Sequence, residues 1–247
     1  LTIDSWGKGH LWLDGQVVCD HAGVGIEFRA LSNWTGDSNR NQGVSDFFIR
    51  SGGTARNAGG AVALQFNAQN GESLNAANYR MEEINGGEIA CNFVTAGTGV
   101  ITRCRFILWG IHGFANGASG IGLVVPNGVN DCLFDVEVAS PVSSVYTASL
   151  GSVGCTYHLR EYRSQRVTIR LDAGANLNDL HIDAPFASEF RLEDNSGNIT
   201  NRVWFNGNMV TTFVIKDPVG DTTVVDATAG AVQVSARDNT PRIVSEI

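Results

Sequence analysis

Two segments of this chain, 28 residues apart, repeat the same alternating pattern. Residues 103–109 read RCRFILW and residues 131–137 read DCLFDVE. Because side chains alternate between the two faces of a β-strand, each segment would present Cys, Phe and an aliphatic residue on one face. Those faces are Cys104, Phe106 and Leu108 in the first segment, and Cys132, Phe134 and Val136 in the second. Matching inner faces separated by one loop-rich interval predict neighbouring turns of a coiled parallel solenoid.

The rest of the chain is divided into short candidate strands by 29 glycines and many asparagines. No stretch of 11 residues or more has a helical apolar period. A further Cys-x-Phe, at Cys91 and Phe93, would lie on another side of the same turn. The pattern predicts an all-β chain: a right-handed parallel β-helix over residues 23–210, with N-terminal cap strands over 1–22, including a hairpin around Asp14–Gly15. Residues 211–247 are expected to form a C-terminal β cap or an oligomerisation segment.

A β-sandwich is the alternative fold, because it also contains short, irregularly spaced strands. The β-helix is favoured because asparagine, glycine and the Cys/Phe pairs recur at nearly equivalent positions. Stacked side chains of one kind satisfy the turns and the core of a coil. A sandwich has no need of such repetition.

Charge and cysteine spacing exclude several classes of partner. The formal charge is -8, with Lys8 and Lys216 the only lysines, so nucleic acid is not an expected partner. No window of about 18 residues is continuously apolar, so no membrane span is expected. The five cysteines lack zinc-type spacing and are interpreted as buried thiols, with a disulfide as the alternative. We expect no metal and no cofactor. Arginine suits forked contacts with acidic or neutral sugars.

Residues 99–106 (GVITRCRF) and 128–134 (GVNDCLF) resemble the turns of bacteriophage tailspike and pectate-lyase-type β-helix proteins. The resemblance extends over about residues 40–206 and lies in the style of the turns. It implies a homotrimer, on a virion or outside the cell, that binds and often cleaves a bacterial surface polysaccharide. No catalytic residue is carried over, because no catalytic motif of the family is matched.

A patch of acids, guanidinium groups and an indole is expected on the outer faces of the two matching strands. A 28-residue offset places Arg103 beside Asp131. It also places Trp109, which could stack on a sugar ring, beside Glu137. Asp135 and Glu137 would lie roughly 7 Å apart along the strand, close to the carboxyl separation of inverting glycosidases. The candidate catalytic residues are Asp135, Glu137 and Asp131, and the candidate substrate-binding residues are Trp109, Arg103 and Arg105.

Two other clusters are candidates. The segment 157–163, YHLREYR, is dense in ionisable and aromatic residues. A polysaccharide lyase needs a base and a cation that holds the uronate carboxylate, and His158 or Tyr162 with Arg160 could serve; a Tyr/Arg contact between subunits is the alternative. Glu82, Glu83 and Glu88 lie near Arg80, which could simply pair with one of them. Likewise, alternating acids on a strand can be no more than a solvated or ion-paired face.

The leading functional hypothesis is a tailspike-like protein that binds and hydrolyses a bacterial surface polysaccharide, as a glycoside hydrolase. The first alternative is a non-enzymatic trimeric spike module with a structural or receptor-binding role. The second is a secreted polysaccharide lyase or epimerase. Exposure of Trp109 and Trp204 along one groove would favour sugar binding, whereas their burial between subunits would favour the structural role.

Overall fold

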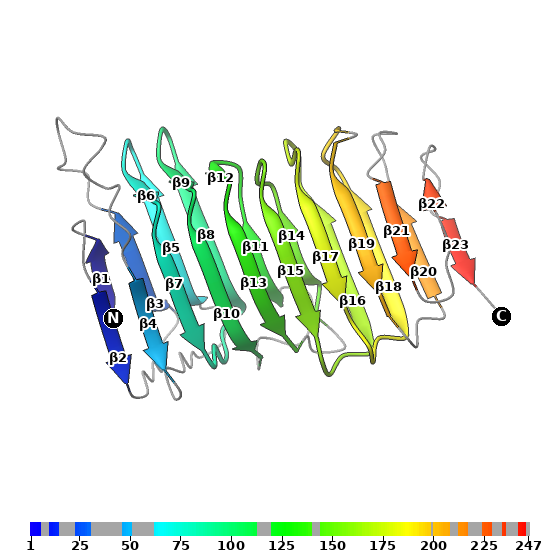
Figure 1. The fold of residues 1–247 in the computed structure, drawn as a ribbon, viewed down its shortest axis with the longest axis horizontal. Helices are drawn as coiled ribbons and strands as arrows, with labels where there is room; N and C mark the ends of the chain where they lie inside the picture. Colours follow the sequence, from blue (N-terminus) through cyan, green and yellow to red (C-terminus); the bar gives the residue numbers. More distant parts are fainter. Residues whose placement is uncertain are drawn as a thin grey trace.

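The chain is a right-handed parallel β-helix, as the sequence pattern predicts (Figure 1). The structure is a computed structural model, and it describes residues 1–5, 10–14, 23–30, 46–50, 62–112, 120–139, 144–198, 200–207, 212–216, 224–228, 234–235 and 242–245. These residues form 23 strands and no helix. Among them no helix could therefore cross a membrane.

Two ten-stranded sheets and one short sheet make the sides of the coil. Sheet A contains β1 (Thr2–Ser5), β3 (Val24–Ala30), β5 (Val62–Gln69), β8 (Ile89–Ala96), β11 (Ile121–Val125), β14 (Tyr146–Leu150), β16 (Arg166–Leu171), β18 (Glu189–Asp194), β20 (Thr212–Lys216) and β23 (Arg242–Ser245). Sheet B contains β2 (His10–Asp14), β4 (Asp46–Arg50), β7 (Asn78–Glu82), β10 (Arg105–Ile111), β13 (Leu133–Val138), β15 (Thr156–Glu161), β17 (Asp179–Asp183), β19 (Arg202–Asn206), β21 (Val224–Thr228) and β22 (Val234–Ser235). The short sheet consists of β6 (Ser73–Asn75), β9 (Val100–Thr102) and β12 (Val129–Asn130).

Parallel pairing runs through both long sheets as far as β20 and β21, beyond residue 210. At that end β23 pairs with β20 and β22 pairs with β21 in the antiparallel sense. At the other end β1 pairs with β3 and β2 with β4, so β1 and β2 are the edge strands of different sheets. The hairpin expected around Asp14–Gly15 lies largely outside the described residues.

The core is a double stack of aromatic rings. On the side of sheet B, Tyr79, Phe106, Phe134 and Tyr157 stack with centroid separations of 5.1, 5.0 and 4.6 Å. On the side of sheet A, Phe28, Phe66 and Phe93 stack at 5.2 and 4.7 Å, and Phe66 meets Phe106 edge-on at 4.9 Å. All six inner-face residues predicted for 103–109 and 131–137 are buried. The alternation in the sequence is therefore confirmed as the core pattern.

The corner before sheet B carries a ladder of buried side chains, one from each turn. The backbone N–H of Cys104 donates to Sγ of Cys132, and that of Cys132 donates to Sγ of Cys155, both over 3.4 Å. The N–H of Cys155 then donates to Oδ1 of Asn178, and the N–H of Asn178 to Oδ1 of Asn201. Together with Cys91 of sheet A, the cysteines of this ladder are buried and unoxidised, as expected. Cys19 lies outside the described residues.

The length of a turn changes along the coil. Arg105 pairs with Leu133 and Leu108 with Val136, which confirms the 28-residue offset. From β13 to β19 the offset in sheet B is 23 residues, as in the Cys132–Cys155 and Cys155–Asn178 contacts. The earlier register also shifts between Leu108 and Ile111, where Gly110 has a φ of 65°. The expected pairing of Trp109 with Glu137 falls in this irregularity, and the register partner of Trp109 is Glu82 in β7.

Candidate functional site

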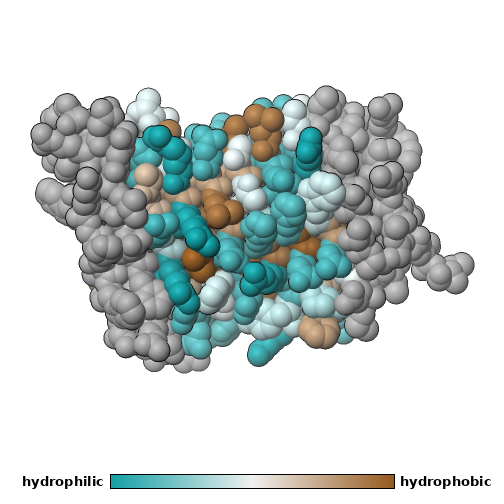
Figure 2. All heavy atoms as spheres, viewed as in Figure 1, coloured by the Kyte–Doolittle hydropathy of each residue, from teal (hydrophilic) through white to brown (hydrophobic). Residues whose placement is uncertain are grey.

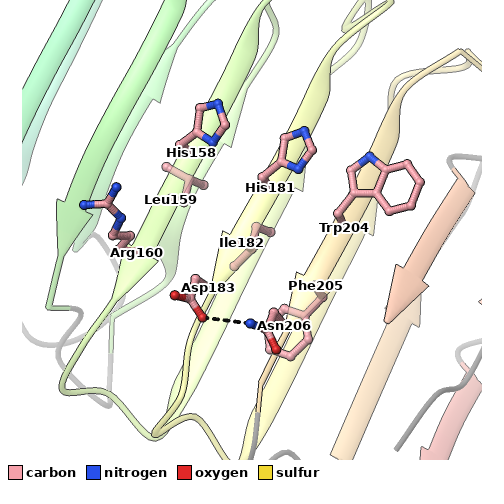
Figure 3. Close-up of a pocket in the computed structure, with 9 residues that line it drawn as sticks. All are labelled: His158, Leu159, Arg160, His181, Ile182, Asp183, Trp204, Phe205 and Asn206. Atoms are coloured by element: carbon pink, nitrogen blue, oxygen red, sulfur yellow. Dashed lines mark hydrogen bonds between the residues drawn. The ribbon is translucent and has the colours of Figure 1, made fainter. Parts of the chain in front are cut away.

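The outer face of sheet B brings chemically related side chains into columns, because residues in register on parallel strands lie beside one another. His158 pairs with His181, and His181 with Trp204. We call these three residues the ring column. Two residues further along each strand, Arg160 pairs with Asp183, and Asp183 with Asn206. We call these three the polar column. Figure 3 shows both columns projecting from β15, β17 and β19 on one face.

A shallow trough of about 340 Å³ is lined by the two columns, with Leu159, Ile182 and Phe205 between them. Leu159, Ile182 and Phe205 direct their side chains into the core, so the backbone of the three strands forms the floor. On the face seen in Figure 2, hydrophilic side chains cover most of the described surface and apolar ones are exposed among them. The volume is at the lower end of the range for small-molecule sites, which suits a sugar unit or two.

The rings of the ring column stack on one another. The centroids of His158 and His181 are 5.1 Å apart with the planes 12° apart. Those of His181 and Trp204 are 6.1 Å apart with the planes 8° apart. Trp204 is 40% exposed, and His158 is also exposed. The column is therefore accessible to solvent at both of its ends, and Asp226 of β21 is in register beyond Trp204.

Asp179 fixes two of these rings from the side. Its Oδ1 accepts the indole N–H of Trp204 over 2.8 Å, and its Oδ2 lies 3.3 Å from Nε2 of His181. A carboxylate facing Nε2 favours the tautomer that carries its proton there. The lone pair of His181 is then on Nδ1, where it can accept a hydrogen bond.

The polar column combines opposite charges with an amide. Arg160 is 54% exposed in its side chain and lies 3.7 Å from Oδ1 of Asp135, too long for a hydrogen bond. Asp183 is exposed and accepts Nδ2–H of Asn206 over 3.3 Å. The column thus offers both donors and acceptors over three successive turns.

The outer face of sheet A is different, because its charged groups satisfy one another. Glu189 accepts hydrogen bonds from Arg166 and Arg191. Glu193 accepts one from Tyr146 over 2.8 Å and another from Lys216 over 3.0 Å. Such closed networks stabilise a surface and leave little for a ligand. Sheet B carries the better candidate site.

Some of the predicted site residues converge on this face. Asp135 and Glu137 point outward from β13, in register with His158 and Arg160 of β15. The two acids therefore lie one turn from the trough, although neither lines it. Oδ1 of Asp135 is shielded from solvent and has no hydrogen-bond partner within the described residues. The acids of β13 and the segment 157–163, which the sequence presents as separate clusters, thus lie on neighbouring strands, while their catalytic role stays a prediction.

Asp131 and Arg103 do not belong to the strand face. Strands β13 and β10 begin at Leu133 and Arg105, and the two residues occupy the preceding corner with φ of 52° and 54°. The expectation that they lie on the strand with Asp135 is therefore wrong. Both are exposed at the corner, two residues before the strands. A left-handed backbone at this position turns the chain into sheet B, and Asp131 lies beside Gly154 at the same corner of the next turn.

Trp109 and Arg105 lie on β10, two turns from the trough. The Arg80 guanidinium covers the Trp109 ring at 4.6 Å and donates to Glu82 over 3.1 Å. Trp109 is half-buried, so it does not form one exposed groove with Trp204. The acidic cluster near Arg80 therefore includes the simple salt bridge that was its alternative interpretation.

Tyr162 lies beyond the end of β15, apart from the trough residues. Burial raises the pKa of its hydroxyl, and Arg163 packs over its ring at 5.3 Å. A tyrosine with a raised pKa is a poor base near neutral pH. Of the three residues predicted in this segment, His158 and Arg160 line the trough and Tyr162 does not.

The 28-residue offset does not relate the residues that complete the trough. His181, Asp183, Trp204 and Asn206 all lie in turns of 23 residues. The signal that could have found them is the spacing of 23 from His158 to His181 and from His181 to Trp204.

Comparisons with protein-family models, with curated proteins and with solved structures find no match for the chain. In the described part of the chain, no group of three or more His, Cys, Asp or Glu side chains could hold a metal ion.

Proposed function

We propose that the chain binds a polysaccharide in the trough of sheet B, in the manner expected of a tailspike-like protein directed at a bacterial surface glycan. The observation that carries this proposal is the exposed Trp204, which forms one wall of the trough with two imidazoles opposite a column of hydrogen-bonding side chains. Aromatic side chains beside polar groups are the usual means of holding sugars, which have apolar faces and hydroxyl edges.

A repeating surface suits a repeating ligand. Successive strands of a sheet lie about 4.8 Å apart, so the trough extends across three strands with one ring and one hydrogen-bonding side chain at each step. A polymer can contact each step with a successive part of its chain, and the small binding free energies of these contacts then add along its length. This supports a glycan rather than a single small molecule.

Hydrolysis is the second candidate function, with Asp135 and Glu137 as the acids. The observation in its favour is their outward position in the turn next to the trough, where a bound glycan could extend to reach them. The contact of Asp135 with Arg160 weighs against a free acid at that position. Binding without cleavage, as in a receptor-binding spike module, remains the alternative to it.

The test is affinity electrophoresis of the protein in gels that contain bacterial capsular and O-antigen polysaccharides, compared with Trp204→Ala and Phe186→Ala. Phe186 is 58% exposed but does not line the trough, so its variant controls for the loss of an exposed aromatic residue. We expect retardation by at least one glycan, its loss in Trp204→Ala and its retention in Phe186→Ala. Absence of retardation across the panel would contradict the proposal.

The same panel decides between binding and cleavage. New reducing ends without absorbance near 235 nm would indicate hydrolysis, and their loss in Asp135→Asn and Glu137→Gln would assign it to these residues. Absorbance as well would indicate a lyase. Retardation without either signal would establish a binding module.

A further inference from the structure

We propose that the trough is selective for uncharged sugars with neighbouring hydroxyl groups, and disfavours both uronates and amino sugars. This inference rests on the proposed function and names the class of glycan that the same site takes. It comes from the order of charges in the polar column and from the stacking of the rings opposite.

Opposite charges alternate along the polar column. Glu137, in the turn before the column, is in register with Arg160, and Arg160 with Asp183, so Arg160 lies between two acids. Asp135 and Asp179 flank the ring column on the same face. A uronate carboxylate placed on Arg160 would have acids on both neighbouring strands, Asp135 and Asp183, and an ammonium group placed on Asp183 would have Arg160 on the neighbouring strand. Either ligand therefore has a group of its own charge one strand away.

A hydroxyl group avoids this conflict because it donates and accepts at once. Asp183 uses Oδ1 for the amide of Asn206, and no described contact engages its Oδ2. Arg160 presents only donors, and Oδ1 of Asn206 presents an acceptor. Two adjacent hydroxyls of one sugar can therefore accept from Arg160 and donate to Asp183. The column matches the mixed polarity of a neutral sugar edge.

The ring column reinforces the choice, because its rings leave no room for a sugar between them. Centroid separations of 5.1 and 6.1 Å are less than the roughly 7–8 Å that an inserted ring would need at van der Waals contact on both sides. The imidazoles are therefore available at their edges, where Nδ1 of His181 can accept a hydrogen bond from a hydroxyl group. Beyond Trp204 the register partner is Asp226 of β21, so the far side of the indole also borders a strand. Recognition depends mainly on hydrogen bonds to hydroxyls.

The test measures binding of the intact chain to polymers of three charge classes: neutral dextran, mannan and galactan; acidic polygalacturonate; and cationic chitosan. We expect at least one neutral polymer to bind more tightly than either charged one. We expect Asp183→Asn to reduce affinity for that neutral polymer by about tenfold, because a neutral amide oxygen is a weaker acceptor than the carboxylate. The same variant should bind polygalacturonate more tightly than the native chain, because a like charge is removed.

Glu88→Gln is the matched control, since it makes the same change in net charge just before β8 of sheet A, and it should alter neither affinity. Tighter binding of polygalacturonate or chitosan than of any neutral polymer, with loss in Trp204→Ala, would overturn the inference and leave the proposed function standing. Unchanged neutral binding in Asp183→Asn would overturn it also. No binding of any polymer, here or in the bacterial panel, would overturn both.

Discussion

Trp204 donates its indole N–H to a carboxylate oxygen of Asp179, which belongs to the preceding turn of the coil, over 2.8 Å. The other oxygen of Asp179 faces His181, so one acid sets the orientation of two rings. Asp179→Ala should therefore weaken glycan binding about threefold to tenfold while changing the free energy of unfolding by less than about 1 kcal/mol, as is usual for exposed polar contacts. Titration with a glycan that retards the protein in the gel measures binding, and thermal unfolding measures stability. A large loss of stability with unchanged binding would show that Asp179 supports the fold and not the trough.

Phe134 lies between Phe106 and Tyr157 in the core stack, at 5.0 and 4.6 Å. Phe134→Ala should destabilise the chain by about 3–5 kcal/mol, because it opens a cavity in a fully buried column. Denaturant unfolding followed by tyrosine and tryptophan fluorescence measures the loss. Phe186→Ala, at an exposed position, should change the midpoint little, and an equal loss in both variants would contradict the stacked core.

Asn178 is the point at which the corner ladder changes from cysteine to asparagine. Its side chain accepts the N–H of Cys155 and the hydroxyl of Ser152, and donates to the carbonyl of Ser152 over 2.7 Å. Asn178→Ala leaves the N–H of Cys155 buried without its partner, at a cost of about 1–3 kcal/mol. The Ser152 hydroxyl keeps its contact with Tyr157, and the Ser152 carbonyl keeps the N–H of Asn176.

Asn178→Cys should recover part of the loss, because the thiol of Cys155 already accepts the N–H of Cys132 in the previous turn. Thermal unfolding of the two variants makes the comparison. Equal destabilisation by Ala and Cys would show that the ladder contact itself contributes nothing.

Glu189 makes the stability of the fold depend on pH. Burial alone would raise the pKa of this carboxyl, but hydrogen bonds and charges from Arg166 and Arg191 outweigh it and hold the pKa below its ordinary value. A pKa that is lower in the folded chain stabilises the fold above the unfolded-state value of about 4.3, and this stability is lost as the pH falls through the folded-state pKa.

The melting temperature should therefore fall less between pH 6 and pH 3 in Glu189→Gln than in the native chain. Scanning calorimetry at the two pH values measures this difference. Glu88→Gln serves as the comparison, because Glu88 has no described ion pair, and its pH dependence should match that of the native chain. An identical fall in all three proteins would refute the role of Glu189.

The core was predictable from sequence because a strand imposes a strict alternation on buried residues. Cys104, Phe106 and Leu108 reappear as Cys132, Phe134 and Val136, and burial of both sets follows from one rule. The outward direction of Asp135 and Glu137 follows from the same rule. The left-handed backbone of Asp131 does not follow from it. An aspartate is compatible both with a strand and with the left-handed conformation of a corner, so the sequence pattern does not distinguish them.

The trough was hidden for a different reason. Its walls depend on the offset between turns, and the offset falls from 28 residues at Cys104–Cys132 to 23 afterwards. The residues that mark the corner also change from Cys155 to Asn178, so the motif that revealed the first turns is absent from the later ones. Two histidines and a tryptophan share a column without resembling one another as a sequence repeat. Their equal spacing of 23 residues is the one trace of this column in the sequence, and the pairing of strands shows what it means.

The constant offset of 23 residues in β13, β15, β17 and β19 has a consequence for how this surface can evolve. Each such turn begins and ends at the same corner and stacks on its neighbours through the same ladder position. A tandem duplication of residues 156–178 would therefore insert one complete turn. Every later strand would move along the axis of the coil and would still pair with equivalent strands. The outer face would gain one more step of the same width. Duplication of a turn could thus change the number of polymer units that the surface recognises, and the outer side chains of the new turn could later diverge in sequence.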